Sequence, residues 1–372
     1  IRVVKAYVRE PFEIQKFHQI SEDVFYQFKY AEKIVAWNSP LMQFCMYNCI
    51  LLVSGLGARL IVGGSMSTGE LTSMIIYAVQ ILSSLMMLSM VFVMVIMARS
   101  SAERIVEVLE EESSLADPEH PIREVKDGSI DFHHVDFSYI GDGEKLALKD
   151  VDIHIKPGET IGILGGIGSS KTTFVQLIPR LYDVTAGCLK VGGRDVRQYD
   201  LKSLRDQVAM VLQKNVLFTG TIRDNLKWGS PNASEEAIIH ACRLSQADEF
   251  IRQFPDQYDT FLDQGGTNVS GGQKQRLCIA RALTVEPEVL LLDEPCSALD
   301  VRSSAVIEEM LAKLKETYTI VIVTHNIAQA KRIADDAAFV FEGRLVEYGE
   351  ARELFEHPQE EETKSFLEGI YG

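Results

Sequence analysis

One stretch of the sequence constrains the fold more than any other. The apolar run Ile161–Leu164 opens into a glycine-rich loop that ends in Lys171 and Thr172, and the residues that follow are typical of a helix. A strand, a glycine-rich loop, Lys-Thr and a helix in this order predict a P-loop, in which backbone N–H groups at the helix N-terminus surround a phosphate. Lys171 then supplies a positive charge, and the Thr172 hydroxyl can bind Mg²⁺. Ser170 occupies the position where glycine is usual, so we expect its Cβ close to the phosphates.

Two uncharged runs predict a pair of membrane helices. The first covers about residues 41–62, where the 18 residues before Arg59 carry no charge, and the second covers 71–97, all 27 of which are uncharged. A helix needs about 20 apolar residues to cross the hydrocarbon core of a bilayer. A pair of buried core helices is the alternative, although globular helices seldom stay uncharged for this length. Basic residues flank the pair, so both ends are expected in the cytoplasm and the turn at 63–70 outside.

The sequence before and after this pair predicts further helix. Residues 1–39 are polar and charged with scattered aromatic residues, and they predict a long amphipathic helix interrupted at Pro11 and Pro40. Residues 98–112 combine charges with an apolar stripe and predict a cytoplasmic continuation of the second membrane helix. We therefore expect a partial transmembrane domain over 1–112.

The second half of the chain predicts a soluble α/β domain over residues 127–372, after a proline-containing linker at 113–126. Alternating apolar residues predict edge strands at about 130–139 and 151–155. Fully apolar runs predict central strands of a parallel sheet, which is buried on both faces. These runs are Ile161–Leu164, Val289–Leu292 and Ile320–Val323.

Composition excludes some functions. The net charge of −16 argues against nucleic acid as a partner, because no basic field would attract phosphodiester backbones. The six cysteines contain no CxxC pair and are expected to be reduced and mostly buried. The N-terminus does not resemble a signal peptide, and Ile1 is not an initiator Met, so we expect a fragment of a longer protein.

Two more motifs complete a nucleotide site. The apolar strand that ends in Asp293 and Glu294 would place one carboxylate in the shell of Mg²⁺ and the other beside the attacking water. The segment Ser270–Gln273 precedes an expected helix at 274–283, where its N–H groups and hydroxyl can meet an anion. Each motif alone is also common in ordinary structure, as a strand end or a helix cap. Their order behind a P-loop indicates a shared function.

The Ser270–Gln273 segment resembles the signature motif of ABC ATPases, with Val269 in place of the commoner leucine. Other positions match that family in order. Tyr139 resembles the aromatic residue that stacks on adenine, and Gln213 resembles the Q-loop glutamine. The segment 297–300 resembles the D-loop, and His325 resembles the switch histidine that contacts the γ-phosphate.

The resemblance implies an α/β P-loop NTPase of the ABC type, preceded by an all-α transmembrane segment with part of the helices of a type I exporter. It also implies ATP and Mg²⁺ as cofactors. The implied catalytic residues are Glu294, His325, Lys171 and Gln213, and the implied metal ligands are Thr172, Gln213 and Asp293. The implied ATP-binding residues are Tyr139, Gly165, Gly166, Ile167, Gly168, Ser169, Ser170, Lys171, Thr172, Thr173, Gln213, Ser270, Gly271, Gly272, Gln273 and Asp300.

The resemblance covers nearly all of the chain but has two parts. Residues 2–10 resemble the exporter loop that carries a coupling helix, and the two membrane helices resemble the fifth and sixth of six. The segment 263–268 is also similar to half-transporters of the multidrug and lipid exporter class. From about residue 276 onward the chain looks more like the ATPase subunit of bacterial phosphate importers, so the sequence looks composite.

The resemblance implies an ATP-hydrolysing transport subunit, which would export a drug, lipid or peptide through the inner membrane of a bacterium. It implies a second half-subunit, identical or different, and the lipid bilayer as partners. Three alternatives stay open: a phosphate-import ATPase, an ATP-binding regulatory subunit of a heterodimer, and a soluble ABC ATPase. The uncharged run at 71–97 argues against the last of these.

Overall fold

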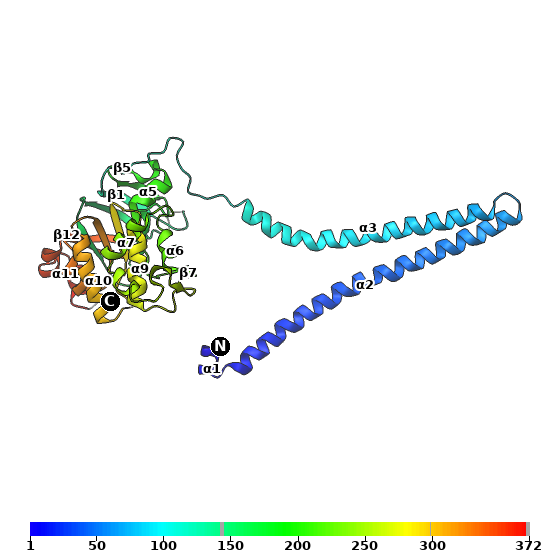
Figure 1. The fold of residues 1–372 in the computed structure, drawn as a ribbon, viewed down its shortest axis with the longest axis horizontal. Coiled ribbons are helices and arrows are strands. Elements are labelled where there is room, and N and C mark those ends of the chain that lie inside the picture. The colour runs from blue at the N-terminus through cyan, green and yellow to red at the C-terminus, as the bar shows by residue number, and fades with distance from the viewer. Residues whose placement is uncertain (142–144, 298, 370–372) are drawn as a thin grey trace. The chain divides into compact units, whose positions relative to one another are not determined.

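The computed structural model describes residues 1–141, 145–297 and 299–369. The chain divides into two compact units, Ile1–Glu112 and Ser113–Gly372. The first unit is helical, and its two long helices α2 and α3 form a hairpin (Figure 1). Its helices are Arg2–Ala6 (α1), Glu10–Val62 (α2) and Thr68–Leu109 (α3). Both long helices have the length and apolar composition needed to cross a membrane.

The helix α2 corrects one expectation. It continues through Pro40 without a break, so the predicted interruption at this residue is wrong. A proline removes one N–H donor and tends to kink a helix, but the bonds on both sides of it remain available. Pro11 lies in the first turn of α2, where an N–H has no partner within the helix in any case.

The second unit is built on a six-stranded sheet in the order β12-β11-β3-β10-β9-β6. Neighbouring strands from β11 to β6 are parallel, and β12 is antiparallel to β11. The three predicted central strands are confirmed as β3, β10 and β9. The strands are Arg344–Glu350 (β12), Asp336–Phe341 (β11), Thr160–Leu164 (β3), Thr319–Val323 (β10), Val289–Asp293 (β9) and Val208–Val211 (β6).

A second, antiparallel sheet has the order β2-β1-β4-β5. Its strands are Leu148–Ile155 (β2), Ile130–Phe137 (β1), Ala186–Val191 (β4) and Arg194–Asp195 (β5). The predicted edge strand at 130–139 is therefore an interior strand, because β1 pairs with β2 on one side and β4 on the other. A short ladder joins Gly220–Thr221 (β7) to Phe261–Leu262 (β8).

Ten helices are described in this unit, and several of them pack on the six-stranded sheet. They are Lys171–Leu177 (α4), Leu201–Gln207 (α5), Ile222–Lys227 (α6), Glu235–Leu244 (α7), Asp248–Ile251 (α8), Gly271–Leu283 (α9), Val301–Leu314 (α10), Ile327–Ile333 (α11), Ala351–Glu356 (α12) and Glu361–Leu367 (α13). Two short 3₁₀ turns span Val196–Gln198 and Gln257–Asp259.

Both faces of the parallel sheet are buried, which explains why its strands are apolar throughout. Alternate residues of β10 point to different cores: Val321 faces the core shared with the antiparallel sheet, and Ile322 faces the core shared with α9 and α10. In the first core, the rings of Phe132 on β1 and Phe174 on α4 stack with centroids 4.2 Å apart. The P-loop helix is thereby fixed between the two sheets.

The exposed face of the antiparallel sheet carries a pH-sensitive pair. His134 Nδ1 lies 2.7 Å from Asp150 Oδ1, and Nε2 lies 3.5 Å from Asp152 Oδ2. The hydrogen bond to Asp150, with the charges of both carboxylates, raises the pKa of His134.

We therefore expect His134 to stabilise the fold only where it is protonated. Because its pKa is raised in the folded state, its contribution is fully present below the unfolded value of about 6.5 and is lost as pH rises through the folded value. Melting temperatures measured from pH 5.5 to 8.5 should show this loss in the parent chain and a flatter profile in His134→Gln. Equal slopes in the two proteins would contradict the assignment.

Candidate nucleotide site

The P-loop begins where β3 ends at Leu164 and leads into α4 at Lys171. Gly165 is required here, because a Cβ on it would lie 2.2 Å from the Val340 carbonyl oxygen. Lys171 is buried, and its Nζ donates to the carbonyl oxygens of Gly165 at 2.8 Å and Gly166 at 2.7 Å. Burial lowers the pKa of Lys171, while the carboxylates of Glu294 and Asp293 oppose this shift. The lysine is thus held inside the loop, as the P-loop motif predicts.

Ser170 has a left-handed backbone, with φ of 73° at the N-terminal end of α4. Glycine adopts this conformation freely, whereas a residue with a Cβ pays about 1 kcal/mol for it. The serine that stands in place of the usual P-loop glycine therefore has a strained backbone in the structure.

Restoring glycine at this position is expected to stabilise the chain. Ser170→Gly should raise the melting temperature by a few degrees, because roughly 1 kcal/mol of strain outweighs the added freedom of the unfolded chain. Ser203→Gly is a suitable control, since its backbone is helical and glycine should destabilise it. A lower melting temperature for Ser170→Gly would contradict this account.

Three polar side chains meet at the carboxyl ends of neighbouring strands. Glu294 follows β9, Gln213 follows β6 and His325 follows β10. Gln213 Nε2 donates to Glu294 Oε2 at 2.9 Å, and His325 Nδ1 lies 3.2 Å from Glu294 Oε1. Since these strands are parallel and adjacent, their carboxyl ends share one edge of the sheet, where α/β proteins place their ligands. The P-loop follows β3 at the same edge.

Glu294 is the centre of this cluster. It has a left-handed φ of 48°, and its backbone N–H donates to the Val323 carbonyl at 2.8 Å. A strained residue held by its surroundings is typical of functional sites. The carboxylate is thus fixed from both sides, by Gln213 and His325, and by its own backbone.

Asp293 and Thr172 provide oxygens that suit Mg²⁺. The Thr172 hydroxyl donates to Asp293 Oδ1 at 3.2 Å, which joins the P-loop helix to the end of β9. Burial raises the pKa of Asp293, the nearby charge of Glu294 adds to this, and the Thr172 hydrogen bond opposes it. A buried carboxylate beside a hydroxyl matches the hard oxygen ligands that Mg²⁺ prefers in sites completed by phosphate and water.

The predicted adenine contact lies beside the P-loop helix. Tyr139 donates or accepts a hydrogen bond of 2.9 Å with Thr173 Oγ1 and leaves its ring half exposed. Tyr182, which the sequence did not single out, packs edge-on against Tyr139 with ring centroids 5.2 Å apart. The predicted adenine contact therefore has a second aromatic side chain beside it. Only the tertiary fold brings it there.

The signature segment forms a separate group. Ser270 caps α9, and its hydroxyl accepts from Gln273 N at 3.2 Å, while Gln273 Oε1 accepts from Ser270 N at 2.9 Å. Gly272 packs against Ser303, since a Cβ on it would lie 2.7 Å from Ser303 Oγ. Ser303 Oγ in turn donates to Asp300 at 2.7 Å.

The signature segment and the D-loop aspartate thus share Ser303, which was missed in the sequence. Within the described residues, no hydrogen bond or ion pair links this group to the P-loop. Ala298, inside the predicted D-loop, lies outside the described residues. Of the other predicted residues, Ile167 is almost fully exposed at the tip of the P-loop, and Ser169 is buried.

Comparison with known families agrees with this geometry. Residues 148–297 match the family model described as ABC transporter, and residues 1–86 match the model described as ABC transporter transmembrane region. The chain belongs to the ABC transporter family. It therefore combines part of a transmembrane region with an ATP-binding domain of the ABC type.

Several relatives extend the match over the whole chain. It is 38% identical over 361 residues to an uncharacterized ABC transporter ATP-binding protein, YfiB, of Bacillus subtilis, which covers 96% of this chain and 62% of that protein. It is 33% identical over 354 residues to the ATP-dependent lipid A-core flippase of Desulfotalea psychrophila, with 95% and 61% covered. The chain thus spans about three fifths of the length of these relatives.

A solved structure gives the same result. The structure of a bacterial Atm1-family ABC exporter with ATP bound matches 100% of this chain and 64% of that one, with a TM-score of 0.82 and 26% identity. The match to exporters therefore continues past residue 276, where the sequence resembles importer ATPases. The exporter-type relatives support the export interpretation and not the phosphate-import alternative.

Proposed function

We propose that this chain is the ATP-hydrolysing half-subunit of an ABC exporter. The observation that carries the proposal is the joined set of contacts at one sheet edge. Gln213 and His325 hold Glu294, and Thr172 holds Asp293, beside a buried P-loop lysine. The same chain carries a hairpin of two apolar helices.

In the proposed reaction, the γ-phosphate of ATP lies between Lys171 and Glu294. Glu294 accepts a proton from water as the water oxygen bonds to the γ-phosphorus, and the bond from that phosphorus to the bridging oxygen of ADP breaks. His325 contacts the γ-phosphate, and Gln213 keeps the Glu294 carboxylate in position. Thr172, Asp293 and Gln213 would hold Mg²⁺, which when bound neutralises charge on the phosphate oxygens.

We further propose that two such ATPase domains close head to tail. Each ATP would then lie between one P-loop and the Ser270–Gln273 segment of the other subunit. The signature segment supports this, because Ser270 and Gly271 are exposed at the N-terminus of α9 and, among the described residues, no hydrogen bond or ion pair joins the segment to its own P-loop. The segment near residues 7–12, which resembles a coupling helix, would transmit closure of the ATPase domains to the membrane helices.

The transported molecule is proposed to be a lipid, a drug or a peptide, moved across the inner membrane of a bacterium. Bacterial relatives that include a lipid A-core flippase support this class. A single observation favours a second candidate, an ATP-binding regulatory subunit of a heterodimer. The strained Ser170 in the P-loop could hold ATP without fast turnover.

One experiment separates the two candidates. ATP turnover of the purified chain is measured against its own concentration, beside Glu294→Gln. Turnover per chain that rises with concentration and disappears in the variant supports a working homodimer. Negligible turnover despite ATP binding favours the regulatory subunit. Turnover that is unaffected by the substitution contradicts both candidates.

A further inference from the structure

The segment 113–126, predicted as a linker, is packed against the ATPase domain. We call it the strap, because it connects the end of α3 to the first strand of the domain. Ile122 N donates to Gln198 O, and Asp200 N donates to Ile122 O, each at 2.9 Å. Its Val125 belongs to the domain core. The strap is therefore part of the folded ATPase unit rather than a free tether.

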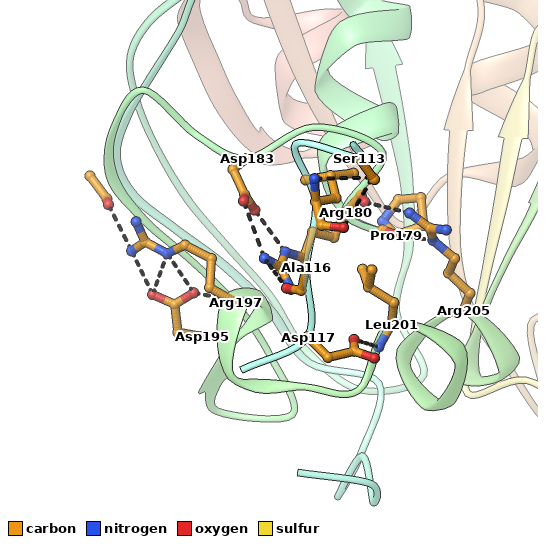
Figure 2. A network of polar contacts seen from close by, with 12 residues as sticks. Ser113, Ala116, Asp117, Pro179, Arg180, Asp183, Asp195, Arg197, Leu201 and Arg205 are labelled. Carbon is orange, nitrogen blue, oxygen red and sulfur yellow. Dashed lines mark hydrogen bonds and ion pairs between the residues drawn. The ribbon is translucent and has the colours of Figure 1, made fainter. Parts of the chain in front are cut away.

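Two adjacent strap residues contact two different elements (Figure 2). The Ala116 carbonyl oxygen accepts from Arg180 Nη2 at 3.2 Å, and Arg180 lies three residues after the end of α4. The Asp117 carboxylate accepts from Leu201 N at 2.8 Å, at the first residue of α5. The strap thus contacts the chain just beyond the P-loop helix and the start of the next helix at neighbouring positions.

Both contacted elements lead to the nucleotide site. The helix α4 has only seven residues, and its first residue is Lys171. Its length of about 10 Å separates the phosphate site from the region of Arg180. The helix α5 runs directly into β6, which is followed by Gln213. The strap contacts are therefore separated from Lys171 by the short helix α4, and from Gln213 by α5 and β6.

Arg180 is held in this position by burial and by an ion pair with Asp183. It is 4% exposed, its φ is 51°, and its guanidinium binds Asp183 through Nε at 2.7 Å and Nη2 at 3.2 Å. Its Nη1 is buried and has no hydrogen-bond partner among the residues that the structure describes. A buried, strained arginine with an unsatisfied donor is costly, so its surroundings must hold it in place.

Arg205 connects α5 to the loop that carries Arg180. From α5 it donates to the carbonyl oxygens of Pro179 at 3.1 Å and Arg180 at 2.8 Å. Burial and the charge of Arg180 lower the pKa of Arg205, and the Asp117 carboxylate opposes this shift. Two guanidinium groups thus lie close together, with Asp183 and the strap carboxylate as their counter-charges.

From this geometry we infer that Arg180 is a positioning residue that links occupation of the nucleotide site to the order of the strap. The inference rests on the proposed function, since it requires ATP at the P-loop. ATP that orders the P-loop helix also orders the loop that carries Arg180, and Arg180 then holds the Ala116 carbonyl. By thermodynamic reciprocity, an ordered strap favours ATP.

Hydrogen exchange of the full chain in detergent tests this inference. Amide exchange in residues 113–126 is measured with and without MgATP, in a Glu294→Gln background that retains bound ATP. We expect ATP to slow exchange in the strap by about fivefold or more, the lower range of a typical coupling between sites. ATP affinity is measured in parallel by titration calorimetry.

Arg180→Lys is expected to abolish this slowing and to change ATP affinity only slightly, by about the same fivefold factor at most. A lysine keeps the charge but cannot bind Asp183 and the Ala116 carbonyl together, because it lacks the planar fork. Asp117→Ala, at an exposed residue, breaks the other strap contact and is expected to have the same effect. It keeps the test valid if Arg180→Lys fails to fold.

Arg197→Gln is the matched control. Arg197 also pairs with an aspartate of this domain, Asp195 at 2.7 Å, but in the described part of the chain no hydrogen bond or ion pair joins its side chain to the strap (Figure 2). It should retain the ATP-dependent slowing. The inference is overturned if ATP binds without slowing exchange in the parent strap, if Arg180→Lys and Asp117→Ala keep the slowing, or if Arg197→Gln removes it equally. Failure of ATP to bind at all overturns the proposed function, and this inference with it.

Discussion

Glu294→Gln is expected to lower ATP turnover by about 10²–10⁴-fold, the range for loss of a general base. The amide has nearly the same shape as the carboxylate, so Gln213 and His325 keep a neighbour at 2.9 Å and 3.2 Å. It cannot accept the proton of the attacking water. Steady-state phosphate release at saturating MgATP measures the effect, and ATP affinity from calorimetry should stay within a few-fold of the parent value.

Glu159→Gln is the matched control for this substitution. Glu159 is also a partly buried glutamate next to a central strand, but it precedes β3 and therefore lies at the amino edge of the sheet. Its carboxylate accepts from the backbone N–H of Lys156 at 2.9 Å, and within the described residues no hydrogen bond or ion pair joins it to Lys171, Gln213, Glu294 or His325. ATP turnover should be unchanged in Glu159→Gln. Equal losses in the two variants would show that Glu294→Gln acts through stability rather than chemistry.

The parts of the site that the sequence predicts are those set by a single strand end. Asp293, Glu294 and His325 follow fully apolar runs, and such runs become central strands because both of their faces are buried. Parallel strands then bring their carboxyl ends to the same edge. Local pattern and a general rule of sheet topology are sufficient for these residues.

Other parts of the site depend on contacts between distant segments. Tyr182 packs edge-on against Tyr139, which is 43 positions earlier in the sequence. Ser303 lies between Gly272 and Asp300 because α9 packs on α10. Nothing in the local sequence around Tyr182 or Ser303 distinguishes it from an ordinary surface residue. The family resemblance identified Tyr139, Gly272 and Asp300 as candidate site residues. Only the fold shows that Tyr182 and Ser303 lie beside them.

The fold shows the same distinction between what local sequence determines and what contacts between distant segments determine. Strand type was predicted from periodicity, but the position of β1 was not, because its edge or interior place is decided by β4, about 50 residues later. Pro40 predicts an interruption of the helix, yet the length of α2 on both sides maintains the helix. The strap looked like a linker because its prolines are visible in the sequence and its contacts with Arg180 and Leu201 are not.

Lys171→Ala is expected to weaken ATP binding and to slow turnover. A charge-assisted hydrogen bond contributes about 1.5–3 kcal/mol, which corresponds to a loss of roughly 10- to 150-fold in ATP affinity. Turnover at fixed ATP should fall further, by about 10²–10³-fold, because the developing charge on the γ-phosphate loses its nearest protein cation. Calorimetry and phosphate release on the same preparation measure the two effects.

Lys156→Ala provides the control, because Lys156 is exposed and pairs with Glu159 at 3.7 Å at the amino end of β3. It should bind and hydrolyse ATP like the parent chain. Comparing Lys171→Ala with Glu294→Gln then separates the two functions proposed for this edge of the sheet, phosphate binding and water activation. If Lys171 holds the phosphates and Glu294 activates water, the first variant loses affinity and the second retains it. Normal ATP affinity in Lys171→Ala would show that this loop does not bind the phosphates, and the proposed function would then have to be abandoned.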